Sequence, residues 1–119
     1  MAQTRWQDIF DFLKSKGFNI FSPATKTGEC TEKYLVLQYG GGEKYATFSS
    51  IKDTYTIMCF VPKNNYSELE VYKNEVVEAM KEMQPMIMPA YSVSTPYYDD
   101  SYKAHMLTID YTNNKKITR

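Results

Sequence analysis

This sequence contains few cysteines and one histidine, carries a formal net charge of zero and lacks long apolar runs. Its two cysteines, Cys30 and Cys59, are too few for a disulfide framework, and we expect both to be reduced thiols. The sequence has a single histidine, His105, and its two cysteines lie far apart. It therefore lacks the closely spaced pairs of cysteine or histidine that bind a metal ion. Fourteen basic residues balance fourteen acidic ones, which disfavours a nucleic-acid clamp with a basic stripe.

Apolar segments are short throughout the chain. No window approaches the length of a membrane span, and the first ten residues lack the apolar run of a signal peptide. We therefore expect a protein made in the cytosol, with no membrane, no cofactor and no sequence-specific nucleic acid among its partners.

Tyrosine is unusually frequent, with eleven copies in 119 residues. This length fits one domain, residues 1–119. Eleven phenol groups are too many to bury with satisfied hydroxyls, so several tyrosines are expected on the surface or in interfaces. Tyrosine suits an interface because it combines apolar area with a polar tip.

Two segments have the apolar spacing of amphipathic helices. The first begins at Thr4, a candidate N-cap, and ends near Gly17; its apolar face comprises Trp6, Ile9, Phe10 and Leu13. The second begins at a capping box formed by Ser67 and Glu70. Its apolar stripe comprises Leu69, Tyr72, Val76, Met80 and Met83.

Extended segments make up most of the remainder. Residues 18–21 form a short extended piece, residues 25–33 a polar loop and residues 112–119 a polar, frayed tail. Strands are predicted over residues 34–39, 44–50, 53–61, 90–94 and 102–111, with "GGGE" as the turn after the first of them. The order α, β, β, β, α, β, β predicts an α+β fold with one mainly antiparallel sheet packed against two helices.

Three sites could carry chemistry, and each has a simpler structural interpretation. Cys59 and His105 could form a nucleophile pair, but nothing in the sequence orients them. Asp99 and Asp100 could act as acid and base, yet aspartate is a common turn former. "GGGEK" lacks the strand–helix setting of a phosphate loop. We therefore predict no enzyme activity.

Contact surfaces are the alternative to a catalytic site. The acidic turn before the closing strand combines several tyrosines with two adjacent aspartates, and two methionines lie between prolines after the second helix. The candidate interface residues are Met86, Met88, Tyr97, Tyr98, Asp99, Asp100 and Tyr102.

The order of elements resembles the tail terminator, or tail-completion, proteins of long-tailed bacteriophages and phage-tail-like particles. The resemblance covers the helix "WQDIFDFLKSKG", the strand meander, the helix "SELEVYKNEVVEAMKEM" and the closing "YYDDSYKAHMLTIDY". It implies a ring, commonly of six subunits, that caps the tail tube, stops its polymerisation and presents a surface to the head.

The resemblance also implies partners and a location. The partners would be further copies of the chain, the tail-tube protein and a head-completion protein; the ring would be assembled in the bacterial cytoplasm and end in the virion tail. The residues expected to face the tube or lumen are Lys26, Glu29, Glu32, Lys33, Glu43 and Lys44. A head-completion protein of the same phage, or a small monomeric host-directed binding protein, remains the alternative.

Overall fold

The computed structural model describes residues 4–25, 28–44, 50–84 and 87–116. Two α-helices and six strands confirm the predicted α+β class. Their bounds are α1 Arg5–Ser15, β1 Ile20–Phe21, β2 Tyr34–Lys44, β3 Ser50–Pro62, α2 Glu68–Met80, β4 Met88–Val93, β5 Tyr97–Asp99 and β6 Ala104–Lys116. Short 3-10 turns, η1 Lys63–Asn65 and η2 Lys81–Met83, flank α2.

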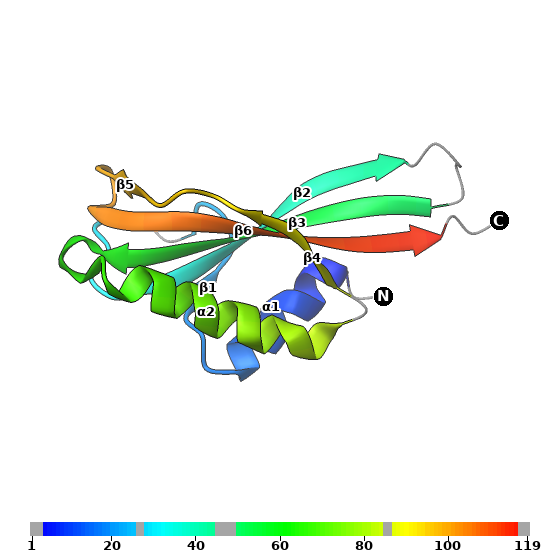
Figure 1. Ribbon diagram of the computed structural model, residues 1–119, viewed down its shortest axis with the longest axis horizontal. Coiled ribbons are helices and arrows are strands. Elements are labelled where there is room, and N and C mark those ends of the chain that lie inside the picture. Colours follow the sequence, from blue (N-terminus) through cyan, green and yellow to red (C-terminus); the bar gives the residue numbers. More distant parts are fainter. Residues whose placement is uncertain (1–3, 26–27, 45–49, 85–86, 117–119) are drawn as a thin grey trace.

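One sheet organises the molecule. Its strands run in the order β1-β2-β3-β6-β4, and β5 pairs with β6 beside β4. All pairs are antiparallel except β1 with β2, which is parallel. Both helices lie on the same face of the sheet, and β2, β3 and β6 extend past them at one end (Figure 1). The molecule is therefore elongated, with extents of 51 × 30 × 25 Å.

Helix α1 begins and ends where its sequence predicts. The hydroxyl of Thr4 accepts a hydrogen bond from the backbone N–H of Gln7, at 3.2 Å, which satisfies one of the free donors of the first turn. Gly17 has a φ of 94° just after the helix, in the region that glycine adopts readily. The indole N–H of Trp6 donates to the carbonyl of Leu37 at 2.9 Å, which fixes α1 against β2.

The predicted glycine turn is wrong, because Gly40 to Gly42 continue strand β2. The register shifts between Tyr39 and Gly41, which marks a β-bulge with one extra residue. A Cβ added at Gly40 would lie 3.2 Å from the carbonyl oxygen of Thr54, so glycine lets the two backbones approach closely. The predicted strand over residues 44–50 lies mostly outside the described residues, between the ends of β2 and β3.

The polar tail is also different from the prediction, since residues 112–116 belong to β6. They pair with β3 from Thr112 opposite Thr54 to Lys116 opposite Ser50. Backbone pairing with a neighbouring strand outweighs the polar composition of this segment. The short extended piece gives the two-residue strand β1, which pairs with Leu35 and Val36 of β2.

Helix α2 keeps its predicted stripe but not its capping box. Ser67 has helical angles, φ −63° and ψ −17°, and its side chain makes no capping hydrogen bond. A capping residue needs an extended backbone, whereas here the preceding turn η1 leads straight into the helix. Leu69, Tyr72, Val76 and Met80 are buried as predicted.

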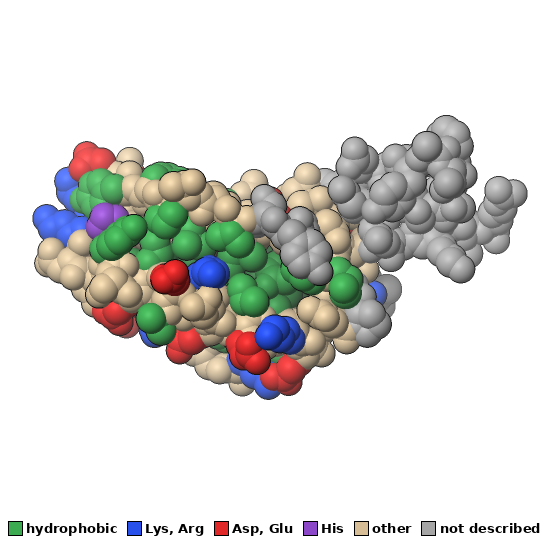
Figure 2. Space-filling model, in the orientation of Figure 1, with side chains coloured by type: hydrophobic (Ala, Val, Ile, Leu, Met, Phe, Trp, Pro, Cys, Tyr) green, Lys and Arg blue, Asp and Glu red, His purple; other side chains and the backbone are tan. Residues whose placement is uncertain are grey.

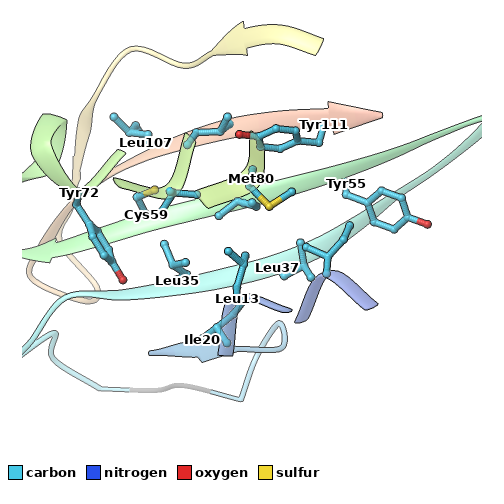
Figure 3. Close-up of a cluster of buried hydrophobic side chains, with 14 of the residues drawn as sticks. Leu13, Ile20, Leu35, Leu37, Tyr55, Cys59, Tyr72, Met80, Leu107 and Tyr111 are labelled. Carbon is cyan, nitrogen blue, oxygen red and sulfur yellow. The ribbon is translucent and has the colours of Figure 1, made fainter. Parts of the chain in front are cut away.

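The main core lies between the helices and the sheet (Figure 3). Alternate residues of β3, from Tyr55 to Val61, face it, together with Leu107, Ile109 and Tyr111 of β6. A smaller cluster covers part of the opposite face and comprises Cys30, Tyr34, Phe60, Ala104 and Met106. Leu107 and Ile109 therefore lie on the helical side of the sheet.

Buried tyrosines predict a loss of stability in alkali. Burial raises the pKa of Tyr111 to about 12, and that of Tyr55 likewise to about 12. The unfolded chain releases these protons first, so their contribution to stability is complete below about pH 10 and is lost as the pH rises toward about 12. Denaturation midpoints at about pH 8 and about pH 11 should therefore differ, and Tyr111→Phe should reduce the difference. Equal midpoints would contradict the burial of these phenols.

Candidate interaction surface

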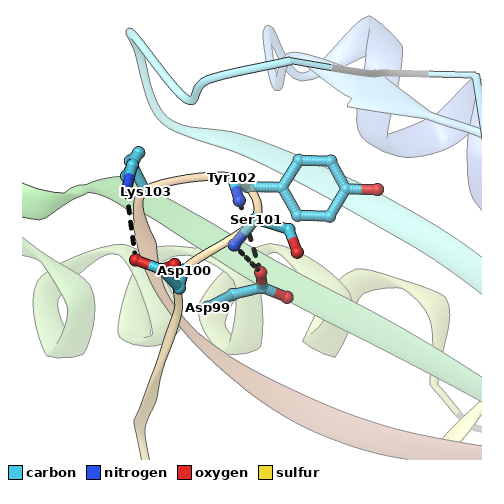
Figure 4. Close-up of polar contacts among 5 residues, drawn as sticks. All are labelled: Asp99, Asp100, Ser101, Tyr102 and Lys103. Atoms are coloured by element: carbon cyan, nitrogen blue, oxygen red, sulfur yellow. Dashed lines mark hydrogen bonds and ion pairs between the residues drawn. The ribbon is translucent and has the colours of Figure 1, made fainter.

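The hairpin between β5 and β6 is the centre of the candidate surface (Figure 4). One carboxylate oxygen of Asp99 accepts hydrogen bonds from the backbone N–H groups of Ser101, at 2.9 Å, and Tyr102, at 3.3 Å. Lys103 closes the turn with a φ of 52°. Asp99 is therefore a turn residue whose acceptor capacity is used within its own chain.

Asp100 differs from its neighbour because it is exposed. Its carboxylate pairs with the ammonium of Lys103 at 3.1 Å, and this hydrogen bond raises the pKa of Lys103. The cation that Asp100 meets therefore belongs to its own turn. An exposed pair of this kind contributes little to stability.

Two exposed tyrosines and the histidine form what we call the tyrosine patch: Tyr66, Tyr98 and His105. Tyr97 is also exposed, but it lies opposite Met106, on the other face of the hairpin. The exposed fractions are 56% for Tyr66, 51% for Tyr97 and 41% for Tyr98. The ring of His105 lies 4.8 Å from that of Tyr66 and 5.2 Å from that of Tyr98. The patch occupies one end of the molecule, around the histidine in Figure 2.

Tyr102 does not join this patch. Its ring turns inward and lies 6.0 Å from the ring of Phe60, beside the smaller core cluster. Its carbonyl accepts a hydrogen bond of 2.7 Å from the N–H of Cys30. We therefore assign Tyr102 to the structure of the hairpin and keep Tyr97 and Tyr98 as candidate contacts.

An apolar hollow, the edge groove, continues from the patch between α2 and the strands β4 and β6. It consists of two adjoining depressions of about 320 and 410 Å³ that share Lys73 and Val93. Figure 2 shows hydrophobic side chains gathered over this region. Val93 is 48% exposed, and Met88, at the start of β4, is 39% exposed. Met86 lies outside the described residues.

The predicted polar loop is tied to the folded body. Cys30 is buried, Glu32 accepts a hydrogen bond from the amide of Asn19 at 3.3 Å, and Lys33 pairs with Glu75 of α2 at 3.5 Å. An open polar hollow of about 550 Å³ is lined in part by Glu29, Cys30, Glu32, Lys33 and Lys103. Lys26 lies outside the described residues. Removing the whole loop would therefore also remove part of a core cluster.

Glu43 and Lys44 lie elsewhere, in strand β2 and not in a loop. Their register partners are Lys52 and Ile51 of β3. Figure 1 places this end of β2 and the strand β5 at opposite ends of the long axis. The structure therefore separates the two groups of charged residues that the sequence placed on tube- or lumen-facing loops.

Cys59 and His105 have separate surroundings. Cys59 is fully buried in the main core, and burial raises the pKa of its thiol to about 12, which disfavours the nucleophilic thiolate. The Nε2 atom of His105 instead lies 3.2 Å from the carbonyl oxygen of Lys63, and its ring meets that of Tyr66 edge-on in the tyrosine patch. Among the described residues, no group of acidic, histidine and cysteine side chains could hold a metal ion, and no helix could cross a membrane.

Sequence reasoning missed a buried polar pair, Asp53 and Asn113. They face each other across β3 and β6 and are 3% and 4% exposed. The hydroxyl of Tyr39 donates to Asp53 at 2.9 Å. Alternation along the strand could have revealed this pair. Asp53, Tyr55 and Ile57 are two residues apart, so Asp53 lies on the same face of the strand as these two buried residues.

Comparison of the sequence with models of known protein families and with curated proteins finds no match. Evidence for the function therefore comes from the surface of the chain itself.

Proposed function

We propose that this chain is a structural subunit of a phage tail, and that copies of it form a ring that caps the tail tube. The observation that carries the proposal is the tyrosine patch with the adjoining edge groove. Exposed aromatic side chains beside an apolar hollow are typical of protein–protein contact surfaces. The ring ends polymerisation of the tube and provides the surface that joins the head.

The shape of the domain is compatible with such a ring. Its patch and groove lie along the β4–β5 edge of the sheet, whereas β1 and β2 lie at the opposite edge. A contact between unlike edges repeats from one copy to the next. It gives a closed ring when the rotations between successive copies add up to a full turn. A formal net charge of zero leaves little overall repulsion between copies.

The ring would also need contacts with the tail tube and the head. The polar hollow with Glu29, Glu32 and Lys33 offers charged groups of both signs for the tail-tube protein or the head-completion protein. In this proposal the ring is assembled in the bacterial cytoplasm and remains in the virion tail. It needs no cofactor, enzyme activity, membrane or sequence-specific nucleic acid.

A tube-growth assay tests the proposal. The purified chain should bind one end of tubes made from the tail-tube protein encoded in the same phage, and it should stop their elongation. We expect tubes of fixed length with the protein and continued growth without it. Sedimentation provides the second measurement, since a ring is several times heavier than the 13.9 kDa chain. A strictly monomeric chain that also fails to bind tubes would refute the proposal and favour a small monomeric binding protein.

A further inference from the structure

The sheet ends in a three-stranded arm that lies beyond the helices. The arm consists of residues 40–44 of β2, 50–54 of β3 and 112–116 of β6, with β3 in the middle. Figure 1 shows these strand ends extending past both α1 and α2. Because β3 is paired on both sides, the two edges of the arm belong to β2 and β6.

Along the arm, no other described strand pairs with the edge formed by β2. Among the described residues, β1 pairs only with Leu35 and Val36. Nearer the helices, the outward groups of β2 have partners, since Leu35 N–H donates to the carbonyl of Asn19 at 2.8 Å and the Leu37 carbonyl accepts from Trp6. Outward-facing residues alternate along a strand. The extra residue of the bulge shifts this alternation, so Gly42 and Lys44 direct their N–H and C=O groups away from β3.

At the same end of the molecule, no described residue pairs with the outer edge of β6 beyond Thr112. The outward side of β6 is identified by Thr108, whose N–H and C=O both bond to Ser94 at 2.9 Å. By alternation, Asn114 and Lys116 face the same side as Thr108. Within the part of the chain that the structure describes, pairing with β4 stops at Met88 opposite Thr112. Among the described residues, none pairs with the outward backbone groups of Asn114 and Lys116.

From these two edges we infer that successive copies of the chain pair with each other, β2 of one copy against β6 of the next. Both strands are antiparallel to β3, so they run in the same direction, and two copies related head to tail would pair them in parallel. Each edge presents two outward residues at the same spacing. The occupant of each edge is thus a second copy, whose own edge has the matching direction and spacing.

The local sequence permits this contact. Three successive glycines, Gly40 to Gly42, leave no side chain to keep a second backbone away. Main-chain hydrogen bonds across an unpaired edge supply affinity for a second strand. The inference rests on the proposed ring for its closure, but the strand pairing itself needs only two copies.

Proline substitutions test the pairing. Gly42→Pro removes an outward N–H of β2, and Asn114→Pro removes one of β6, while neither removes a donor directed at β3. We expect each variant to weaken self-association of the full chain by at least about tenfold in sedimentation velocity at rising concentration. The matched control is Glu43→Pro, which removes a donor directed at β3 and should lower the melting temperature.

Amide hydrogen exchange of the unmodified chain gives a second measurement. The N–H groups of Gly42, Lys44, Asn114 and Lys116 should exchange more slowly as association increases. The N–H of Glu43, which is directed at β3, should instead be protected to the same degree at every concentration. The inference would be overturned if Gly42→Pro did not weaken association, or if the four edge amides stayed unprotected as the chain associates. Either result would leave the proposed ring unaffected. A chain that stays monomeric at all concentrations would overturn the inference too, and the tube-growth assay would then decide the proposed function separately.

Discussion

Replacement of Tyr97 and Tyr98 by alanine should leave the monomer folded and weaken ring formation by roughly 30-fold or more. Both side chains are exposed, 51% and 41%, and lie on the three-residue strand β5. Aromatic anchors of an interface typically contribute about 1–3 kcal/mol each when they are truncated. Because neither ring belongs to a core cluster, the melting temperature should change little.

The experiment combines two measurements in one buffer. Sedimentation velocity at several concentrations reports association, and a thermal melt reports folding. Val71→Ala is the matched control, since Val71 is also apolar and exposed, 59%, but lies on α2 away from the hairpin. Unchanged association of the double variant would exclude both tyrosines from the ring contact.

Leu107→Ala should have the opposite effect, with a large loss of stability. Leu107 is 3% exposed and packs in the main core between the sheet and α2. Truncation of a buried leucine removes transfer free energy and leaves a cavity, which together cost about 2–5 kcal/mol. Chemical denaturation should show this loss as a lower midpoint with a nearly unchanged slope.

Val93→Ala serves as the control for Leu107→Ala. Val93 lies on β4, lines the same groove and is 48% exposed, so its truncation should cost much less than that of Leu107. Leu107→Ala could instead leave the free energy of unfolding unchanged while the double replacement of Tyr97 and Tyr98 unfolds the protein. That result would show that the core has been assigned to the wrong part of the segment from Tyr97 to Tyr111.

The hairpin combines these two roles within a few residues. Asp99 and Tyr102 shape the turn and dock it against the loop at Cys30, whereas Tyr97 and Tyr98 remain on the outside. A rigid turn holds exposed aromatic rings in place before a partner arrives, which reduces the entropy lost on binding. The tyrosine-rich, acidic composition of this stretch is therefore consistent with a structural turn that presents a contact surface.

Local patterns determined the helices and much of the core. The helical spacing from Trp6 to Leu13 and from Leu69 to Met80 places apolar groups on one face whatever the rest of the chain does. Alternation along Tyr55 to Val61 likewise indicated which side chains face inward. The N-cap at Thr4 was predictable for the same reason, since its hydrogen bond spans only three residues.

The tertiary structure alone decided the features that depend on distant partners. Gly40 to Gly42 and residues 112–116 are strands because β3 offers its backbone to both, although their composition indicates a turn and a frayed tail. The tyrosine patch likewise joins Tyr66 to residues more than thirty positions away. Hydrogen bonds and ring contacts of this kind form between segments that the fold brings together, so they cannot be predicted from the pattern within one segment.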